Sequence, residues 1–128
     1  MSELYCGDAA QVLQTIPRRS VQMCVTSPPY YGLRDYEKDG QIGRESSPEA
    51  YIANLVKVFD EVYRVLMDDG TLWLNIGDTY AKKAQGSVKR KDFIGIPWML
   101  AFALRERGWY LRSDIIWRKT NAMPEGAK

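Results

Sequence analysis

Short apolar runs alternate along this chain with longer segments whose apolar residues recur every three or four positions. The short runs are typical of buried strands, and the longer segments are typical of helices that bury one face. The strongest helix signal follows Ser46 and Ser47, because either serine can cap a helix and Pro48 suits its first turn. The predicted strands are residues 3–8, 21–26, 71–76 and 109–119. The predicted helices are residues 9–16, residues 97–108 and a long helix that begins at Pro48 and ends at Asp69-Gly70.

This alternation predicts an α/β fold with a largely parallel sheet and right-handed crossovers. The strand at 21–26 is apolar enough to be buried on both faces, so we expect helices on each side in a three-layer α/β/α arrangement. In such sheets, ligands bind beyond the carboxyl ends of the strands. Three strand ends carry rigid or polar sequences that the fold should gather along one edge: Gly7-Asp8, Ser27-Pro28-Pro29-Tyr30 and Asn75-Ile76-Gly77-Asp78.

Length and composition exclude several classes of protein. The chain has 128 residues, enough for a single domain over residues 1–128. It has no histidine, which excludes Ser-His-Asp and Cys-His catalysis and histidine-dependent zinc sites, and we expect no metal site. There is no apolar run of about 20 residues and no secretory signal, so we expect no membrane partner. Cys6 and Cys24 lie in apolar runs, which favours buried free thiols in a reducing cytoplasm.

Charge is spread unevenly along the chain. Residues 1–80 hold 7 Lys and Arg against 12 Asp and Glu, a net charge of −5, whereas residues 81–128 hold 11 against 4, a net charge of +7. Five cations follow the third predicted strand: Lys82, Lys83, Lys89, Arg90 and Lys91. Because they follow a strand end on the predicted ligand edge, they are candidates for contacts with the phosphates of a polyanion. A solvated surface loop would have the same composition, and the sequence leaves both interpretations open.

The end of the strand at 21–26 combines rigidity with an aromatic ring. Pro28 and Pro29 each fix one φ angle, so the backbone carbonyls there point in set directions at low entropic cost. Ser27 brings a hydroxyl that can donate or accept, and Tyr30 brings a flat face for stacking. These groups suit a planar heterocycle with an exocyclic amine, such as a base extruded from a duplex. The alternative is a proline-rich turn capped by surface aromatics.

The stretch TSPPY after an apolar strand resembles the catalytic motif of the amino-group DNA methyltransferases, which use S-adenosyl-L-methionine. The segments LYCGD, VYRVLMDDGTLWLNIGD and GIPWMLAFALRERGWYLRSDIIWRKTNAMPE resemble, in this order, the β subgroup of that family, in which the catalytic half precedes the cofactor-binding half. The resemblance covers essentially the whole chain. It implies the Rossmann-like sheet of S-adenosylmethionine-dependent methyltransferases and double-stranded DNA as the partner.

The resemblance also implies roles for individual residues. The residues that would receive the flipped base are Ser27, Pro28, Pro29 and Tyr30. Asp8 would lie near the adenosine part of the cofactor, with Thr26 and Asp78 lining the same cleft; from the residues alone, Asp8 is equally a helix N-cap. Hydrogen bonds from the target amine to Ser27 and the Pro28 carbonyl would favour a tetrahedral nitrogen that attacks the sulfonium methyl in line, so catalysis would be mostly positioning. The serine favours cytosine N4 as the target, with adenine N6 as the alternative.

Part of the family's pattern is missing from the chain. The glycine-rich Phe-x-Gly-x-Gly turn that binds the methionine part of the cofactor is not present, and neither is a target-recognition region. We therefore expect an incomplete sheet, the catalytic half of a larger enzyme, and weak or no activity of this half alone. Its exposed edge would favour a homodimer or a separate C-terminal half as partner. Two functions stay open: a DNA methyltransferase present in part, and a non-catalytic nucleic-acid-binding or assembly module derived from that fold, in the cytoplasm of a bacterial or phage-type context.

Overall fold

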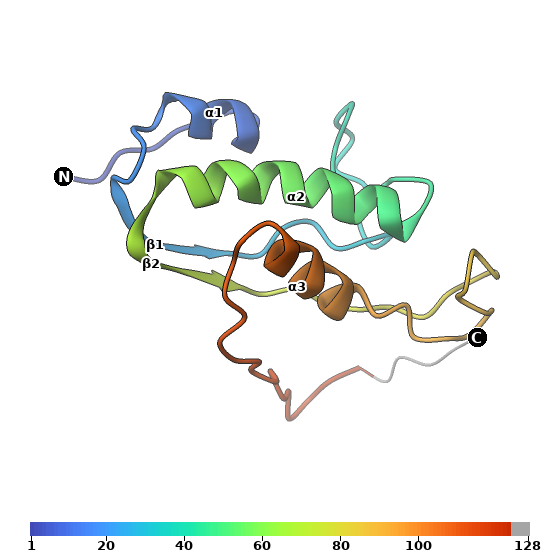
Figure 1. Ribbon diagram of the computed structural model, residues 1–128. Coiled ribbons are helices and arrows are strands. Elements are labelled where there is room, and N and C mark those ends of the chain that lie inside the picture. Colours follow the sequence, from blue (N-terminus) through green and yellow to red (C-terminus); the bar gives the residue numbers. More distant parts are fainter. Residues whose placement is uncertain (124–128) are drawn as a thin grey trace.

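The computed structural model describes residues 1–123 and consists of two parallel strands accompanied by helices (Figure 1). In chain order the elements are α1 (Ala9–Thr15), β1 (Val21–Thr26), α2 (Pro48–Val65), β2 (Leu66–Leu74) and α3 (Ile96–Glu106). The long helix α2 connects the two strands in the β1–α2–β2 crossover that the sequence pattern predicts. None of these helices is both long and apolar enough to cross a membrane.

All three predicted helices are present, and capping groups mark where they begin. The Asp8 carboxylate accepts a hydrogen bond from the backbone nitrogen of Gln11 at 3.1 Å, so Asp8 is the N-cap of α1. The hydroxyl of Ser47 accepts one from the backbone nitrogen of Ala50 at 3.1 Å and caps α2. Helix α3 begins after Gly95, whose φ of 88° lies in the left-handed region that glycine adopts without strain. Local sequence signals therefore predicted the starts of α1 and α2 correctly, and the start of α3 to within one residue.

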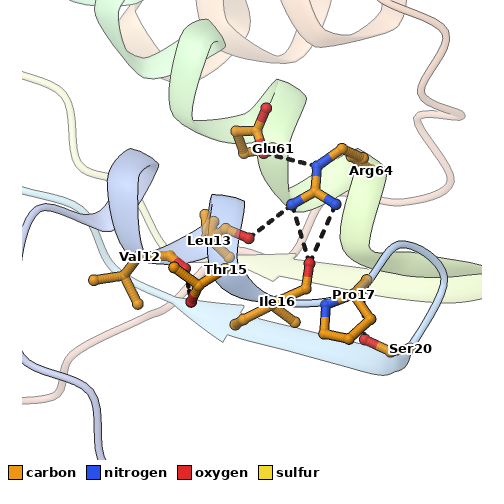
Figure 2. A network of polar contacts seen from close by, with 8 residues as sticks. All are labelled: Val12, Leu13, Thr15, Ile16, Pro17, Ser20, Glu61 and Arg64. Carbon is orange, nitrogen blue, oxygen red and sulfur yellow. Dashed lines mark hydrogen bonds and ion pairs between the residues drawn. The ribbon is translucent and has the colours of Figure 1, made fainter.

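Helix α1 is fixed to the C-terminal end of α2 by Arg64 (Figure 2). The guanidinium of Arg64 donates hydrogen bonds to the carbonyl oxygens of Leu13 at 2.7 Å and Ile16 at 3.2 Å, and to the Glu61 carboxylate at 2.8 Å. Leu13 lies in the last turn of α1 and Ile16 is its C-cap residue, so the arginine binds carbonyl oxygens at the helix end, where backbone acceptors lack partners within the regular helix. The Leu13 carbonyl also accepts a hydrogen bond from the backbone nitrogen of Ile16 at 3.0 Å. Arg64 thereby joins two helix ends that are far apart in the sequence.

Strand β2 begins earlier than predicted, because the helix before it ends earlier. Helix α2 ends at Val65 and not at Asp69-Gly70, since Leu66 is already extended and pairs with the start of β1. Gly70 lacks the left-handed φ that a glycine after a helix end would have. The ladder is irregular at its beginning and then regular, with residues 23–26 of β1 paired to residues 71–74 of β2. The strand predicted at 71–76 matches this regular part at its start, and β2 ends two residues earlier than predicted, at Leu74.

Helices α2 and α3 pack against each other and against one face of the sheet. The buried residues of this core are Tyr51, Ile52, Leu55, Phe59, Val62, Leu66, Ile96, Leu100 and Leu104. The other face is bare, since Met23, Val25 and Trp73 are 55%, 69% and 50% exposed. The prediction that the strand at 21–26 is buried on both faces is therefore wrong for residues 1–123. The third layer of the expected α/β/α arrangement is absent from these residues, because no helix among them packs on the second face.

The predictions of a first strand at residues 3–8 and a last strand at residues 109–119 are also wrong, because neither segment has regular secondary structure. Their apolar side chains are largely open to solvent: Leu4 is 98% exposed and Ile116 is 86% exposed. A strand requires a neighbouring strand to receive its backbone hydrogen bonds, and within residues 1–123 β1 and β2 pair only with each other. Apolar content identified segments suited to a sheet, but the partners for them do not lie in this part of the chain.

The two cysteines give a chemical test of this arrangement. Both are free; Cys6 is exposed, contrary to the predicted burial, whereas Cys24 lies partly buried against the core. Burial raises the pKa of the Cys24 thiol, so less of it is thiolate at a given pH. We expect DTNB at mildly alkaline pH to modify Cys6 at least about tenfold faster than Cys24, measured by absorbance in a stopped-flow instrument. Cys6→Ser should leave only the slow phase, and two equal rates in the unmodified chain would contradict the burial of Cys24.

Candidate functional site

The carboxyl ends of β1 and β2 lie side by side and bring two of the three predicted strand ends together. The backbone nitrogen of Asn75 donates a hydrogen bond to the Thr26 carbonyl at 2.9 Å, which continues the pairing past the regular ladder. Beyond it, the ring of Tyr30 lies directly on the backbone of Gly77: a Cβ placed on Gly77 would come within 2.7 Å of Tyr30 Cε2. Glycine is needed here for close approach, so the turn after β1 rests on the end of β2.

Residues 27–30, called the Pro-Pro turn below, are held in place by contacts from distant parts of the chain. Tyr51, which is 0% exposed, donates a hydrogen bond from its hydroxyl to the carbonyl of Pro29 at 2.8 Å. On the other side, the backbone nitrogen of Gly32 donates to the carbonyl of Gly43 at 2.8 Å. A Cβ on Gly43 would lie 2.9 Å from the Tyr30 carbonyl oxygen, so this segment also approaches the turn closely. Sequence analysis missed Tyr51, Gly43 and the close approach at Gly77, because no local pattern reports which distant residues meet a turn.

The residues predicted to meet the base differ in exposure. Ser27 is exposed, while Pro28, Pro29 and Tyr30 are partly buried. Ser27, at the start of the turn, is therefore open to solvent. The ring of Tyr30 packs against the backbone of Gly77 at the end of β2. A turn with a fixed ring and an accessible hydroxyl offers a stacking surface and a hydrogen-bonding group to a planar molecule.

Asp78 has a structural role that the sequence did not indicate. Its carboxylate accepts hydrogen bonds from the backbone nitrogens of Thr79 at 2.9 Å, Gly95 at 2.8 Å and Ile96 at 3.2 Å. Asp78 thus satisfies the first N–H groups of α3 and ties the end of β2 to that helix. A carboxylate so engaged keeps few acceptor positions for a ligand.

Asp8 and Thr26, also predicted near a cofactor, lie on different elements. Thr26 is the last residue of β1, is partly buried and adjoins the turn. Asp8 is exposed and caps α1, which lies on α2 rather than in the sheet (Figure 1). The expectation that Gly7-Asp8 joins the other strand ends is therefore wrong for the described residues, since residues 3–8 form no strand. Residues 1–123 also hold no group of three or more His, Cys, Asp and Glu side chains suited to a metal ion.

The basic segment, residues 82–91, forms a loop whose two ends are joined by backbone hydrogen bonds. The backbone nitrogens of Ala81 and Lys91 donate hydrogen bonds to the carbonyls of Asp92 and Ala81, both at 2.8 Å. All five cations predicted to contact phosphates are exposed. A cavity of about 320 Å³ lies between this loop and the segment that follows the Pro-Pro turn, with lining residues that include Tyr31, Tyr80, Lys82 and Lys83. Two of the five cations therefore share a cavity with the segment that follows the turn, and the other three do not line this cavity.

Comparison with known proteins adds family relationships to this geometry. Residues 21–128 match a family model described as DNA methylase, of the N6 and N4 type. The type II methyltransferase M.Cfr9I of Citrobacter freundii is 52% identical over an alignment of 146 positions, which covers 98% of this chain and 49% of the relative. The type II methyltransferase M.SmaI of Serratia marcescens is 46% identical, with 98% and 50% of the two chains covered. The chain spans about half the length of the curated relatives it matches.

Solved structures show the same fold. A Thermus thermophilus protein named as a DNA modification methylase superposes with a TM-score of 0.68 at 29% identity, over 94% of this chain and 48% of the other. Its complex with S-adenosyl-L-methionine gives a TM-score of 0.61 at 27% identity, over 94% and 49%. The cytosine-N4-specific PvuII DNA methyltransferase gives 0.56 at 18% identity, over 80% and 32%, a likeness of fold alone. The expected α/β fold of S-adenosylmethionine-dependent methyltransferases is confirmed, as an incomplete sheet.

Proposed function

The chain belongs to the family of N6 and N4 DNA methylases, and from this premise we propose that it forms, as one domain over residues 1–128, the base-binding half of an enzyme that methylates an exocyclic amine of DNA. The observation that carries the proposal is the turn after β1, which is held by Tyr51 and Gly77 and which contains an exposed serine and a fixed aromatic ring at the carboxyl edge of a parallel sheet. The serine that begins the turn favours cytosine N4 as the target, and adenine N6 is the alternative.

Positioning carries most of the chemistry proposed for the turn. The exocyclic amine of cytosine or adenine is a poor nucleophile, because its lone pair is delocalised into the ring. The Ser27 hydroxyl and the Pro28 carbonyl would accept hydrogen bonds from this amine and favour a pyramidal nitrogen with an available lone pair. The ring of Tyr30 would stack on the extruded base and hold it in place. Such fixed orientation can supply a large part of the reduction in barrier height.

The methyl donor in this proposal is S-adenosyl-L-methionine, which when bound supplies an electrophilic methyl group on a sulfonium centre. The chain offers polar groups for part of this molecule. The exposed Asp8 carboxylate can accept hydrogen bonds from amine or hydroxyl groups of the adenosine, and Thr26 lies next to the turn. We propose that Asp78 shapes the cleft by fixing the start of α3. No two glycines of the chain have G-x-G spacing, so the methionine part would be held by residues from a second half.

DNA phosphates are the partners proposed for the basic segment. The five cations Lys82, Lys83, Lys89, Arg90 and Lys91 are exposed, and two of them line the cavity beside the turn. Contacts with phosphates release counterions, so DNA binding should weaken steeply as the salt concentration rises. Because the substrate would be prokaryotic or phage DNA, we place the enzyme in the cytoplasm.

The bare face of the sheet supports the proposal that a second half completes the enzyme. Met23, Val25 and Trp73 are each at least 50% exposed on that face, and contiguous apolar surface of this kind usually contacts another part of a protein. The residues that the chain lacks relative to M.Cfr9I would cover it. A homodimer would cover the same face with a second copy, and sedimentation of the isolated chain distinguishes the two arrangements.

The test compares the chain with a fused enzyme, defined as the chain followed by the part of the Citrobacter freundii M.Cfr9I that it does not match. The fused enzyme should transfer labelled methyl groups from S-adenosyl-L-methionine to duplex DNA, whereas the chain alone should be at least about 100-fold slower, because it cannot orient the donor. Digestion of the product to nucleosides and mass spectrometry then identify N4-methylcytosine or N6-methyladenine.

Ser27→Ala in the fused enzyme tests the role of the turn in the reaction. This variant should lower the methylation rate without weakening DNA binding by a comparable factor. Equal rates for the isolated chain and the fused enzyme would show that the chain is not one half of the active unit. A fused enzyme that is folded and binds DNA but never methylates it would favour the second candidate function, a non-catalytic nucleic-acid-binding module.

A further inference from the structure

The proline pair of the turn proposed to receive the target base has one backbone torsion that its own covalent structure leaves free. The rings of Pro28 and Pro29 fix their φ angles. Ser27 and Pro28 each precede a proline, which restricts their ψ angles to the extended region. The ψ angle of Pro29 has neither restriction, although it sets the direction of the Pro29 carbonyl and the position of Tyr30. The rigidity of the proline pair is therefore incomplete at one bond.

A hydrogen bond from α2 acts on that bond. The hydroxyl of Tyr51 donates to the Pro29 carbonyl at 2.8 Å, and the side chain of Tyr51 is 0% exposed. The backbone nitrogen of Tyr51 donates to the Ser47 carbonyl at 3.1 Å in the first turn of the helix. Its ring packs against the ring of Tyr31 with centroids 5.4 Å apart. The donor is thus held by a helix, by the core and by a neighbouring ring.

We infer that Tyr51 is a positioning residue for methyl transfer, because its hydroxyl fixes the Pro29 carbonyl and with it the direction in which the turn presents its groups to the target amine. This inference rests on the proposed function of the turn. In this inference Tyr51 acts through the Pro29 carbonyl and not by direct contact with the base or the donor.

The hydroxyl keeps its proton under ordinary assay conditions. Burial, followed by the negative charge of Glu45 and the proximity of Tyr30, raises the pKa of Tyr51 well above the usual value for tyrosine. The hydroxyl therefore remains a hydrogen-bond donor at neutral and mildly alkaline pH. The contact with the Pro29 carbonyl is a constant support and not a pH-dependent one.

Tyr51→Phe removes the donor and keeps the buried ring. In the fused enzyme this variant should lower kcat at least about tenfold, while the Kd for duplex DNA changes less than about twofold, because only the geometry of the turn is altered. Tyr63→Phe is the matched control: it lies on the same helix, its side chain is 51% exposed, and its ring packs on Trp109 away from the turn. This control should leave kcat unchanged.

A second measurement, on the isolated chain, does not depend on methylation. The amide of Gly32 donates to the Gly43 carbonyl at the far side of the turn, so its hydrogen exchange reports local opening. Exchange at Gly32 should be at least about fivefold faster in Tyr51→Phe and unchanged in Tyr63→Phe. If the unmodified fused enzyme fails to methylate DNA, the proposed function fails, and the exchange rates still decide whether Tyr51 fixes the turn. Unchanged exchange at Gly32, or an unchanged kcat in an active fused enzyme, would overturn the inference.

Discussion

Gly77→Ala should reduce the methylation rate of the fused enzyme at least about tenfold and destabilise the isolated chain by about 1–3 kcal/mol, because it overpacks the site. The new Cβ would lie 2.7 Å from Cε2 and 2.9 Å from Cδ2 of Tyr30, closer than carbon atoms approach without repulsion. Gly77 does not have a left-handed φ, so alanine does not strain the backbone itself. The clash must therefore displace the Tyr30 ring or the end of β2, and the stacking surface then no longer faces the base.

A double-mutant cycle on the isolated chain identifies the cause of this effect. If the Tyr30 ring is the group that clashes, Gly77→Ala should cost less than about 0.5 kcal/mol in a Tyr30→Ala background, because contacting residues couple and the contact is then gone. Urea denaturation followed by circular dichroism measures both free energies of unfolding. Equal costs in the two backgrounds would show that Gly77 is required for a different reason. In the fused enzyme, Tyr30→Ala alone should weaken target-base binding, which links the same contact to function.

Helices and the two paired strands were predictable because their signals are local. Asp8 and Ser47 precede helices that their side chains cap, and Pro48 opens the second of these helices. The run at 21–26 ends at the Pro-Pro sequence, which cannot continue a ladder. Each of these signals is complete within a few residues, so a reader of the sequence can assign them without knowing the rest of the fold.

Features that depend on distant residues were not predictable in the same way. Residues 3–8 and 109–119 have the composition of strands, but a strand forms only beside another strand, and composition does not tell whether one is available. The end of α2 was misplaced because Leu66 is drawn into pairing with β1, which overrides a plausible Asp-Gly helix end. The supports of the turn, Tyr51 and Gly77, lie far from it in sequence. The sequence therefore indicated the chemical groups of the site, whereas their geometry required the structure.

The second large effect concerns the attachment of α1, the helix that carries Asp8 (Figure 2). Arg64→Met should destabilise the isolated chain by about 2–3 kcal/mol, because it removes charged hydrogen bonds to the carbonyls of Leu13 and Ile16. The Leu13 carbonyl keeps the hydrogen bond that it accepts from the backbone nitrogen of Ile16 at 3.0 Å, whereas the Ile16 carbonyl loses both of its Arg64 donors. Arg64→Lys should cost less than Arg64→Met, because a lysine keeps the charge. It should still destabilise the chain, because lysine lacks the planar fork that reaches both carbonyls. Chemical denaturation with urea measures the free energy of unfolding of each variant.

Glu61→Gln is the control that separates the carbonyl contacts from the ion pair. The Arg64–Glu61 pair is 2.8 Å apart and both side chains are more than 20% exposed (29% and 25%), so its loss should cost less than about 1 kcal/mol. If Glu61→Gln destabilises the chain as much as Arg64→Met does, the ion pair and not the carbonyls holds α1. In the fused enzyme, loosening α1 should raise the KM for S-adenosyl-L-methionine more than it lowers kcat, because Asp8 moves with the helix. A KM that stays constant while α1 is shown by hydrogen exchange to be loosened would mean that Asp8 does not contact the cofactor.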